Sequence, residues 1–184
     1  MQKIISRVCI VSGAVLLTTG LFLTWQRYNP NRLKFQYELS APTPMHTVEP
    51  LILQIPAAHI SVPIQTTALT DNRWPTTTQG VTYLANSPLP GDRGNSIMYG
   101  HNWENILGDL TKVKPGDTIS VSFNNALVKD FRVSYVQIVS PDQTHVLSPT
   151  SDSRLTIYTC TGFLDSKRLV VVSEPIAEGV SYAQ

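Results

Sequence analysis

A cysteine and an arginine stand on either side of a short loop near the C-terminal end of the chain. Cys160 ends the apolar, β-branched segment 155–160, and Arg168 opens a second apolar segment, 168–172. Two such segments joined by the Gly-containing loop 161–167 predict adjacent strands. If these strands pair antiparallel, the last residue of the first lies beside the first residue of the second. The pattern therefore predicts a thiol nucleophile next to a guanidinium that can donate hydrogen bonds to an oxyanion.

Thiol chemistry of this kind also needs a proton donor and acceptor, most often a histidine. His101 follows a short expected strand, 97–99, and Gly100 between them allows close approach of the backbone. Its imidazole would therefore stand at a strand end, which makes His101 the candidate acid or base. The other histidines lie in the stalk, in a turn or in a loop, where a structural or solvated side chain is the simpler interpretation; they are His46, His59 and His145.

Short apolar segments separated by turn signals continue through most of the chain after about residue 50. The segments expected to form strands are 51–55, 60–64, 97–99, 119–123, 128–139, 155–160 and 168–172. Residues 66–95 are rich in Thr, Pro, Asn and Gly, so we expect mostly loop there. Many short strands with regular turn signals predict a mostly β fold that closes, or nearly closes, into a barrel.

The N-terminal part of the chain is a candidate membrane anchor. Residues 8–26 carry no formal charge and are dominated by Val, Leu and Phe. A stretch of roughly 19 residues can just cross a ~30 Å hydrocarbon core as a helix, and Trp25 and Tyr28 fall where interfacial aromatic residues usually lie. The competing interpretation is a cleaved signal peptide with Lys3 and Arg7 as its charged start. We favour an uncleaved anchor, because the segment is long and no small-x-small cleavage site follows it directly.

Composition narrows the remaining possibilities. A net charge of +1 and 15% charged residues give no electrostatic footprint for nucleic acid. Cys9 falls inside the apolar segment, so Cys160 is the thiol of the main domain and we expect no structural disulfide. Prolines among polar residues indicate an extended stalk before that domain. The expected organisation is a short basic segment (1–7), a transmembrane anchor (8–26), a stalk (27–50) and a barrel domain (51–184).

Ordered blocks of this sequence resemble the sortase family. The blocks are Ile55-Pro56 with Ile60–Ile64; Leu89-Pro90-Gly91 with Gly94-Asn95-Ser96 and Tyr99-Gly100-His101; Leu110–Asp117; and Leu155–Thr161 with Arg168–Val171. They span residues 51 to 174 in matching order and spacing. A thiol and an arginine by themselves are a weak motif, so it is the order of the blocks that carries the resemblance.

The resemblance implies a closed eight-stranded β-barrel with short helices, preceded by one N-terminal transmembrane helix. It also implies a cysteine transpeptidase in which Cys160 matches the family's nucleophile, His101 its general acid/base and Arg168 its oxyanion donor. Thr159 matches a threonine common in the family and is a candidate for shaping the peptide groove, although β-propensity accounts for it nearly as well. We expect no cofactor and no metal site.

The substrates implied are C-terminal sorting motifs of secreted proteins, cleaved through a thioacyl intermediate. The acyl group would pass to an amine acceptor on the cell surface, such as cell-wall peptide. The N-terminal helix would hold the protein in a bacterial cell membrane as a single-pass protein, with its catalytic domain on the extracellular side. Charge alone does not decide this orientation, because basic residues flank the apolar segment on both sides.

Several departures and alternatives accompany this prediction. Residues 27–50 contain no Asp-Pro-aromatic lid motif, so attachment of single proteins is favoured over pilin polymerisation. Glu104 and Asp109 form no tight acidic cluster for calcium and are interpreted as solvated charges. The Ser-x-Gly-Cys-x-Arg pattern of an L,D-transpeptidase is absent, and a papain-like hydrolase places its Cys before its His. A hydrolytic sortase-like protease and a non-catalytic peptide-binding surface barrel stay open as alternatives.

Overall fold

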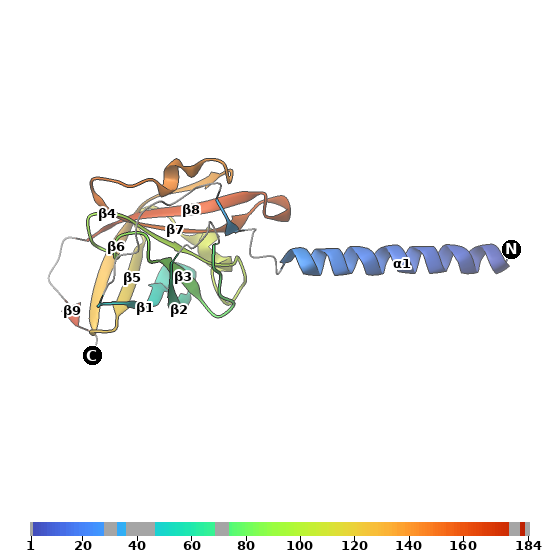
Figure 1. Cartoon of the computed structure of the whole chain (residues 1–184), viewed down its shortest axis with the longest axis horizontal. Coiled ribbons are helices and arrows are strands. Elements are labelled where there is room, and N and C mark those ends of the chain that lie inside the picture. Colours follow the sequence, from blue (N-terminus) through green and yellow to red (C-terminus); the bar gives the residue numbers. More distant parts are fainter. Residues whose placement is uncertain (1, 28–32, 36–46, 69–73, 177–180, 183–184) are drawn as a thin grey trace. The chain divides into compact units, whose positions relative to one another are not determined.

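The chain forms an N-terminal helix and a β-barrel, which belong to different compact units, Met1–Asn31 and Arg32–Gln184. The computed structural model describes residues 2–27, 33–35, 47–68, 74–176 and 181–182. Figure 1 shows the helix and the barrel coloured along the sequence.

Helix α1 comprises Gln2–Arg27. Within it, Ile5–Gln26 is long and apolar enough to cross a membrane. These 22 residues span about 33 Å at 1.5 Å per residue, close to the thickness of a hydrocarbon core. A signal sequence near the N-terminus can meet the same criteria of length and composition, so the division into anchor and stalk stays a prediction.

The strands of the barrel unit follow the apolar segments of the sequence. They are β1 (Pro50–Ile55), β2 (Ile60–Thr67), β3 (Val81–Leu84), β4 (Gly94–Tyr99), β5 (Thr118–Phe123), β6 (Leu127–Val139), β7 (Ser153–Thr161), β8 (Lys167–Pro175) and β9 (Ser181–Tyr182). Short 3₁₀ turns lie between them: η2 (Pro56–Ala58), η3 (Gly108–Lys112), η4 (Thr144–Leu147) and η5 (Phe163–Asp165).

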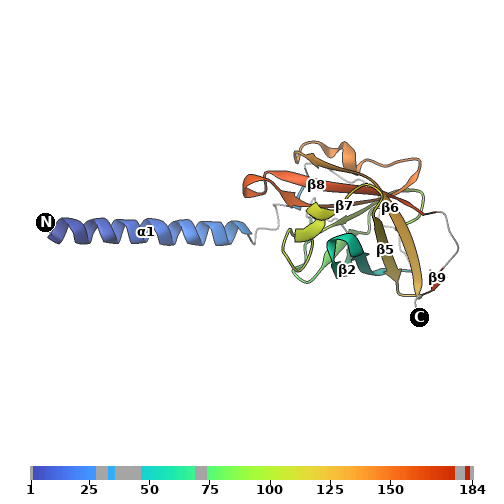
Figure 2. The same cartoon turned by 180° about the vertical axis from the view of Figure 1, so that it is seen from behind.

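Eight of these strands close into a barrel. The sheet order is β5-β1-β2-β3-β4-β7-β8-β6, and β5 also pairs with β6, which removes the open edges. The short strand β9 adds to β6. Figure 2 shows the long strand β6 beside β5 and β8, consistent with its pairing to both. Two pairings are parallel, β2–β3 and β4–β7, so the barrel is mixed. The expected closed eight-stranded barrel is confirmed.

Strand β3 is a strand that the sequence did not predict, within a span (66–95) whose described residues are otherwise mostly loop as expected. All four of its residues are buried, so its sequence lacks the alternation of polar and apolar residues that marks a half-buried strand. It pairs parallel with β2. Gly80, just before it, permits this approach, because a Cβ there would lie 2.1 Å from the carbonyl oxygen of Pro63. Antiparallel pairing of β3 with β4 then places β4 in the middle of the sheet.

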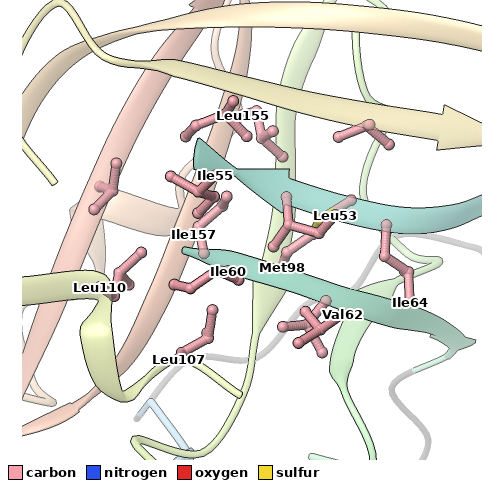
Figure 3. Close-up of a cluster of buried hydrophobic side chains, with 14 of the residues drawn as sticks. Leu53, Ile55, Ile60, Val62, Ile64, Met98, Leu107, Leu110, Leu155 and Ile157 are labelled. Atoms are coloured by element: carbon pink, nitrogen blue, oxygen red, sulfur yellow. The ribbon is translucent and has the colours of Figure 1, made fainter. Parts of the chain in front are cut away.

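The barrel encloses one hydrophobic cluster, whose members come from most of its strands. Figure 3 shows its centre, where side chains of β1, β2, β4 and β7 meet residues near η3. The labelled residues include Leu53, Ile55, Ile60, Val62, Met98, Leu107, Leu110, Leu155 and Ile157. Each fully buried side chain of this kind contributes about 1.5–3 kcal/mol relative to an exposed one. This cluster therefore fixes the frame that carries β4, β7 and β8.

A second hydrophobic cluster covers the other face of β4, β7 and β8. Alternate residues of these strands, such as Tyr99, Tyr158 and Val170, belong to it rather than to the enclosed cluster. It is completed by Leu33 and Phe35 before the first strand, by Trp74, and by Val146 and Leu147 of η4. These three strands are therefore packed on both faces along most of their length. Cys160 is a member of this second cluster.

Candidate active site

Cys160 and Arg168 lie directly opposite each other at the end of the β7–β8 hairpin. The two strands pair antiparallel, with Cys160 in register with Arg168. Opposite residues of an antiparallel pair project to the same face of the sheet. Both are nearly buried, with 4% of Cys160 and 3% of Arg168 exposed. The antiparallel pairing expected from the sequence is confirmed, and it brings the thiol and the guanidinium together.

His101 comes to the same end of the sheet from the neighbouring strand. β4 pairs parallel with β7, with Tyr99 opposite Tyr158. The amide of Gly100 then donates to the carbonyl of Tyr158 at 3.3 Å, so His101 directly follows the last paired position. It therefore lies beside the Cys160 end of β7. The three side chains expected to act together are gathered at one end of three adjacent strands.

The imidazole of His101 is largely buried and is covered on one face by Trp103. The two rings stack with centroids 4.5 Å apart and an angle of 13° between their planes. Burial lowers the pKa of His101 below its usual 6.5, and the carboxylate of Asp165 in η5 acts in the opposite direction. Burial is the larger of these two contributions, so the pKa of His101 is lowered overall.

The guanidinium of Arg168 is bonded to backbone carbonyls. Its Nη1 donates to the carbonyls of Asp165 at 3.0 Å and Lys167 at 2.9 Å, and its Nη2 donates to the carbonyl of Lys34 at 3.1 Å. Among the described residues its buried Nε atom has no hydrogen-bond partner. A buried donor left unsatisfied costs about 1–3 kcal/mol. A nearly buried cation of this kind is well placed to stabilise negative charge that develops beside Cys160.

Residues 33–35, which we call the covering segment, lie over this end of the sheet. Leu33 and Phe35 are fully buried. The ring of Phe35 packs edge-on against Tyr158, with centroids 4.9 Å apart, and lies 5.9 Å from the guanidinium carbon of Arg168. The hydroxyl of Tyr158 donates to the carbonyl of Leu33 at 3.2 Å. Although residues 27–50 carry no Asp-Pro-aromatic motif, part of the expected stalk therefore packs on the candidate site.

Two tyrosines form the floor beneath the covering segment. Tyr99 and Tyr158 stack with centroids 5.4 Å apart, and Trp74 packs edge-on against Tyr99. The hydroxyl of Tyr99 donates to the carbonyl of Pro75. Burial raises the pKa of both tyrosines well above 10, so both hydroxyls stay protonated and act as donors. The floor is therefore apolar and uncharged.

Thr159 projects to the opposite face from Cys160. It is 1% exposed, and its hydroxyl donates to the carbonyl of Gly100 at 2.8 Å. This bond ties β7 to the residue just before His101 and so fixes the distance between the two strand ends. The contact between Thr159 and a peptide that the sequence suggests stays a prediction.

The remaining residues that the sequence singled out lie apart from these contacts or outside the described residues. His46 lies outside the described residues. His59 follows η2 in a left-handed conformation and His145 lies in η4, and both are exposed. Glu104 is exposed, and Asp109 forms an ion pair with Lys112 at 2.7 Å. Within the described ranges, no group of three or more His, Cys, Asp or Glu residues could hold a metal ion.

Sequence reasoning missed two parts of this site. Trp103 and Asp165 lie within a few residues of His101 and Arg168, so their proximity in sequence was an available signal. The covering segment offered no such signal, because 134 positions separate Lys34 from Arg168. Its apolar residues could be placed only once the second cluster was visible.

The fold and a family match together define the class of protein. A closed mixed barrel of eight strands, with an apolar helix before it, is the architecture of sortases. A family model described as a sortase domain matches residues 53–176. This match extends over more than half of the sequence, and the chain belongs to the sortase family.

Individual relatives are distant. The chain is 25% identical over 126 residues to sortase A of Bacillus anthracis, a match that covers 66% of this chain and 57% of that protein. It thus spans little more than half the length of that relative. The structure of sortase A from Listeria monocytogenes superposes with a TM-score of 0.59 at 23% identity, covering 73% of this chain and 90% of that one. For sortase C1 from Streptococcus agalactiae the TM-score is 0.60 at 26% identity, covering 70% and 68%.

Proposed function

We propose that this protein is a membrane-anchored cysteine transpeptidase that cleaves a sorting motif of secreted proteins and transfers the acyl fragment to an amine. Cys160 is the nucleophile, His101 the general acid and base, and Arg168 the donor to the oxyanion. Membership of the sortase family supports this class of reaction.

One contact carries the proposal that the substrate is a peptide. The carbonyl of Lys34, a backbone group of the chain itself, accepts a hydrogen bond from Arg168 Nη2 beside Cys160. The guanidinium of Arg168 therefore binds a peptide carbonyl, which here belongs to the chain itself. A substrate carbonyl that took this position would displace Lys34 and would lie next to the thiol.

The chemistry then follows from the residues in two steps. The Cys160 thiolate attacks the carbonyl carbon, and the tetrahedral oxyanion accepts hydrogen bonds from Arg168. His101 protonates the departing amine as the C–N bond breaks, which leaves a thioester on Cys160. An incoming amine attacks the thioester, its proton passes to His101, and the C–S bond breaks to release the new amide. Water in place of the amine gives hydrolysis by the same route.

The setting of the reaction is proposed on the N-terminal helix and the family together. Helix α1 is consistent with a membrane-anchored protein. We place its N-terminus in the cytoplasm and the barrel outside a bacterial membrane, where secreted proteins and the amines of cell-wall peptide are both available.

The test uses the full-length chain in detergent micelles with a library of Leu-x-x-Thr-x peptides and a glycine- or diaminopimelate-type amine. Mass spectrometry should detect a thioester on Cys160 and an amine-ligated peptide, and Cys160→Ala should fold normally yet give neither product. Cleavage without ligation would identify a hydrolase. No adduct in the wild type, or a Cys160→Ala variant that keeps its activity, would overturn the proposal.

A further inference from the structure

Asp165 is hydrogen-bonded to Arg168 and to Asn102, the residue that follows His101. Its backbone carbonyl accepts a hydrogen bond from Arg168 Nη1 at 3.0 Å. Its carboxylate acts electrostatically on His101. Asp165 lies in η5, the turn that joins the strand bearing Cys160 to the strand bearing Arg168. A single residue of this turn is thus bonded to the candidate oxyanion donor and to the neighbour of the candidate proton carrier.

The carboxylate of Asp165 is held in place from the loop that bears the histidine. The side-chain amide of Asn102, the residue after His101, donates to Asp165 Oδ1 at 3.0 Å across the gap between the two loops. This hydrogen bond joins the loop after β4 to the β7–β8 turn. This hydrogen bond therefore restrains the Asp165 carboxylate at the residue next to His101.

The opposite constraint on the imidazole comes from Trp103. Its ring stacks on His101, and its carbonyl accepts hydrogen bonds from the amides of Ile106 and Gly108. Gly108 is required for this tight turn, because a Cβ there would lie 2.9 Å from the Trp103 carbonyl. The Trp103 ring therefore packs on one face of the imidazole and restricts its rotation.

The backbone of the turn indicates that a side chain is kept at position 165 against a conformational penalty. Leu164 and Asp165 have φ angles of 51° and 58°, the left-handed region that favours glycine. Aspartate and asparagine tolerate this region better than most residues. Strain of this kind, next to reactive groups, points to a functional constraint on the turn.

We propose that Asp165 is a positioning residue of the candidate site, whose carboxylate, held by Asn102, sets the charge and orientation of His101 while its carbonyl directs Arg168. The proposal rests on the proposed function in so far as His101 is the proton carrier. The side chains at neighbouring positions that could also act on His101 are Cys160, Arg168 and Glu104. Among the described residues, it is Asp165 whose charge favours the imidazolium.

The decisive variant is Asp165→Asn, with Glu104→Gln as the matched control. Asparagine keeps the size of the side chain and the left-handed backbone, and the Arg168 contact is with the backbone carbonyl, so the variant removes the charge alone. Glu104 is an exposed carboxylate in the same turn as Trp103, and its removal changes net charge equally.

The first readout does not depend on turnover. The chain, labelled with ¹³C/¹⁵N-histidine in micelles, is titrated by NMR, with the His101 resonance assigned from His101→Gln. The titration midpoint of His101 should move to lower pH in Asp165→Asn and should move less, in the same direction, in Asn102→Ala. It should stay unchanged in Glu104→Gln. A folded Asp165→Asn variant with an unshifted His101 midpoint would overturn the proposal.

The second readout is the pH profile of thioester formation. An imidazolium is needed to protonate the leaving amine, so a lower pKa moves the alkaline limb of the profile to lower pH. At neutral pH the rate should fall about 2- to 5-fold, the range expected for a partly exposed charge pair. A uniform loss at every pH without a shifted limb would assign Asp165 a purely structural role. If the wild type forms no thioester while the NMR midpoint shifts, the proposed function fails and the electrostatic assignment stands.

Discussion

Replacing Phe35 by alanine is expected to expose the Cys160 thiol. Leu33 and Phe35 are fully buried in the same hydrophobic cluster as Cys160, of which only 4% is exposed, and the segment contacts Tyr158 and Arg168 on either side of the thiol. We therefore expect a reagent to reach the thiol when this segment lifts. The rate of labelling therefore reports the population of the open state when opening and closing are fast relative to labelling.

The magnitude follows from the contacts that Phe35 makes. Burying a phenylalanine side chain contributes about 1.5–3 kcal/mol, and an edge-on aromatic pair such as that with Tyr158 adds about 0.5–1.5 kcal/mol. The entropy of ordering the segment is the same in the wild type and in Phe35→Ala, so it cancels when their free energies of opening are compared. A loss of about 3 kcal/mol corresponds to roughly a hundredfold larger open population.

The assay is alkylation of the full-length chain in micelles by iodoacetamide, an uncharged reagent, read at the Cys160 peptide by mass spectrometry. Reading at that peptide separates Cys160 from Cys9, the second thiol of the chain. Lys34→Ala is the matched control, because the acceptor for Arg168 is its backbone carbonyl and a half-buried side chain at this edge contributes little. That control should label within about threefold of the wild type.

The result that refutes this reasoning is equally definite. If Phe35→Ala labels at the wild-type rate while circular dichroism and urea unfolding show an intact barrel, the covering segment does not limit access to the thiol. Loss of the fold is not the expected explanation for faster labelling, because Phe35 is not part of the cluster enclosed by the barrel.

Three further predictions concern the individual groups of the site. Arg168→Lys should slow thioester formation about 10²- to 10³-fold, because an ammonium does not reproduce the planar donors of the guanidinium. A near wild-type rate of thioester formation in quenched-flow experiments would contradict the oxyanion role. Thr159→Val should lower the free energy of unfolding by about 1–3 kcal/mol, because the Gly100 carbonyl loses its donor; Thr159→Ser, which keeps the hydroxyl, should restore most of this loss in urea titrations. The pKa of His101 is lower in the folded protein than its usual 6.5, so the unfolded chain binds the proton more readily. Its contribution to stability is therefore fully present above about pH 6.5 and is lost as the pH falls through the folded pKa. Urea midpoints measured at pH 7 and pH 5 should differ less in His101→Gln than in the wild type.

The sequence by itself determined the parts of this protein that depend on neighbouring residues. Alternation and β-branched composition located β5, β6, β7 and β8, and the short loop between the last two predicted that Cys160 and Arg168 meet if the strands pair antiparallel, as they do. Only eight positions separate these residues, so hairpin geometry alone sets their register. The apolar N-terminal helix is local in the same sense, since its length and composition are read directly from consecutive residues.

Local patterns failed where burial came from distant parts of the chain. Strand β3 is buried on both faces, so it shows no alternation, and its parallel pairing with β2 depends on a close approach at Gly80. His101 reaches Cys160 only through the parallel pairing of β4 with β7. The resemblance to sortases could assign these residues to one site, but their composition and spacing could not.

Only the tertiary structure decided what lies on the site. The covering segment meets Tyr158 and Arg168 across more than a hundred positions of sequence, and nothing in its own residues distinguishes it from an extended stalk. The segment is placed by the second hydrophobic cluster. That cluster forms only when β4, β7 and β8 are aligned, because together they present an apolar face that must be covered. Hydrophobic patterning says that such a face must be covered, but the closure of the barrel decides which distant residues can reach it.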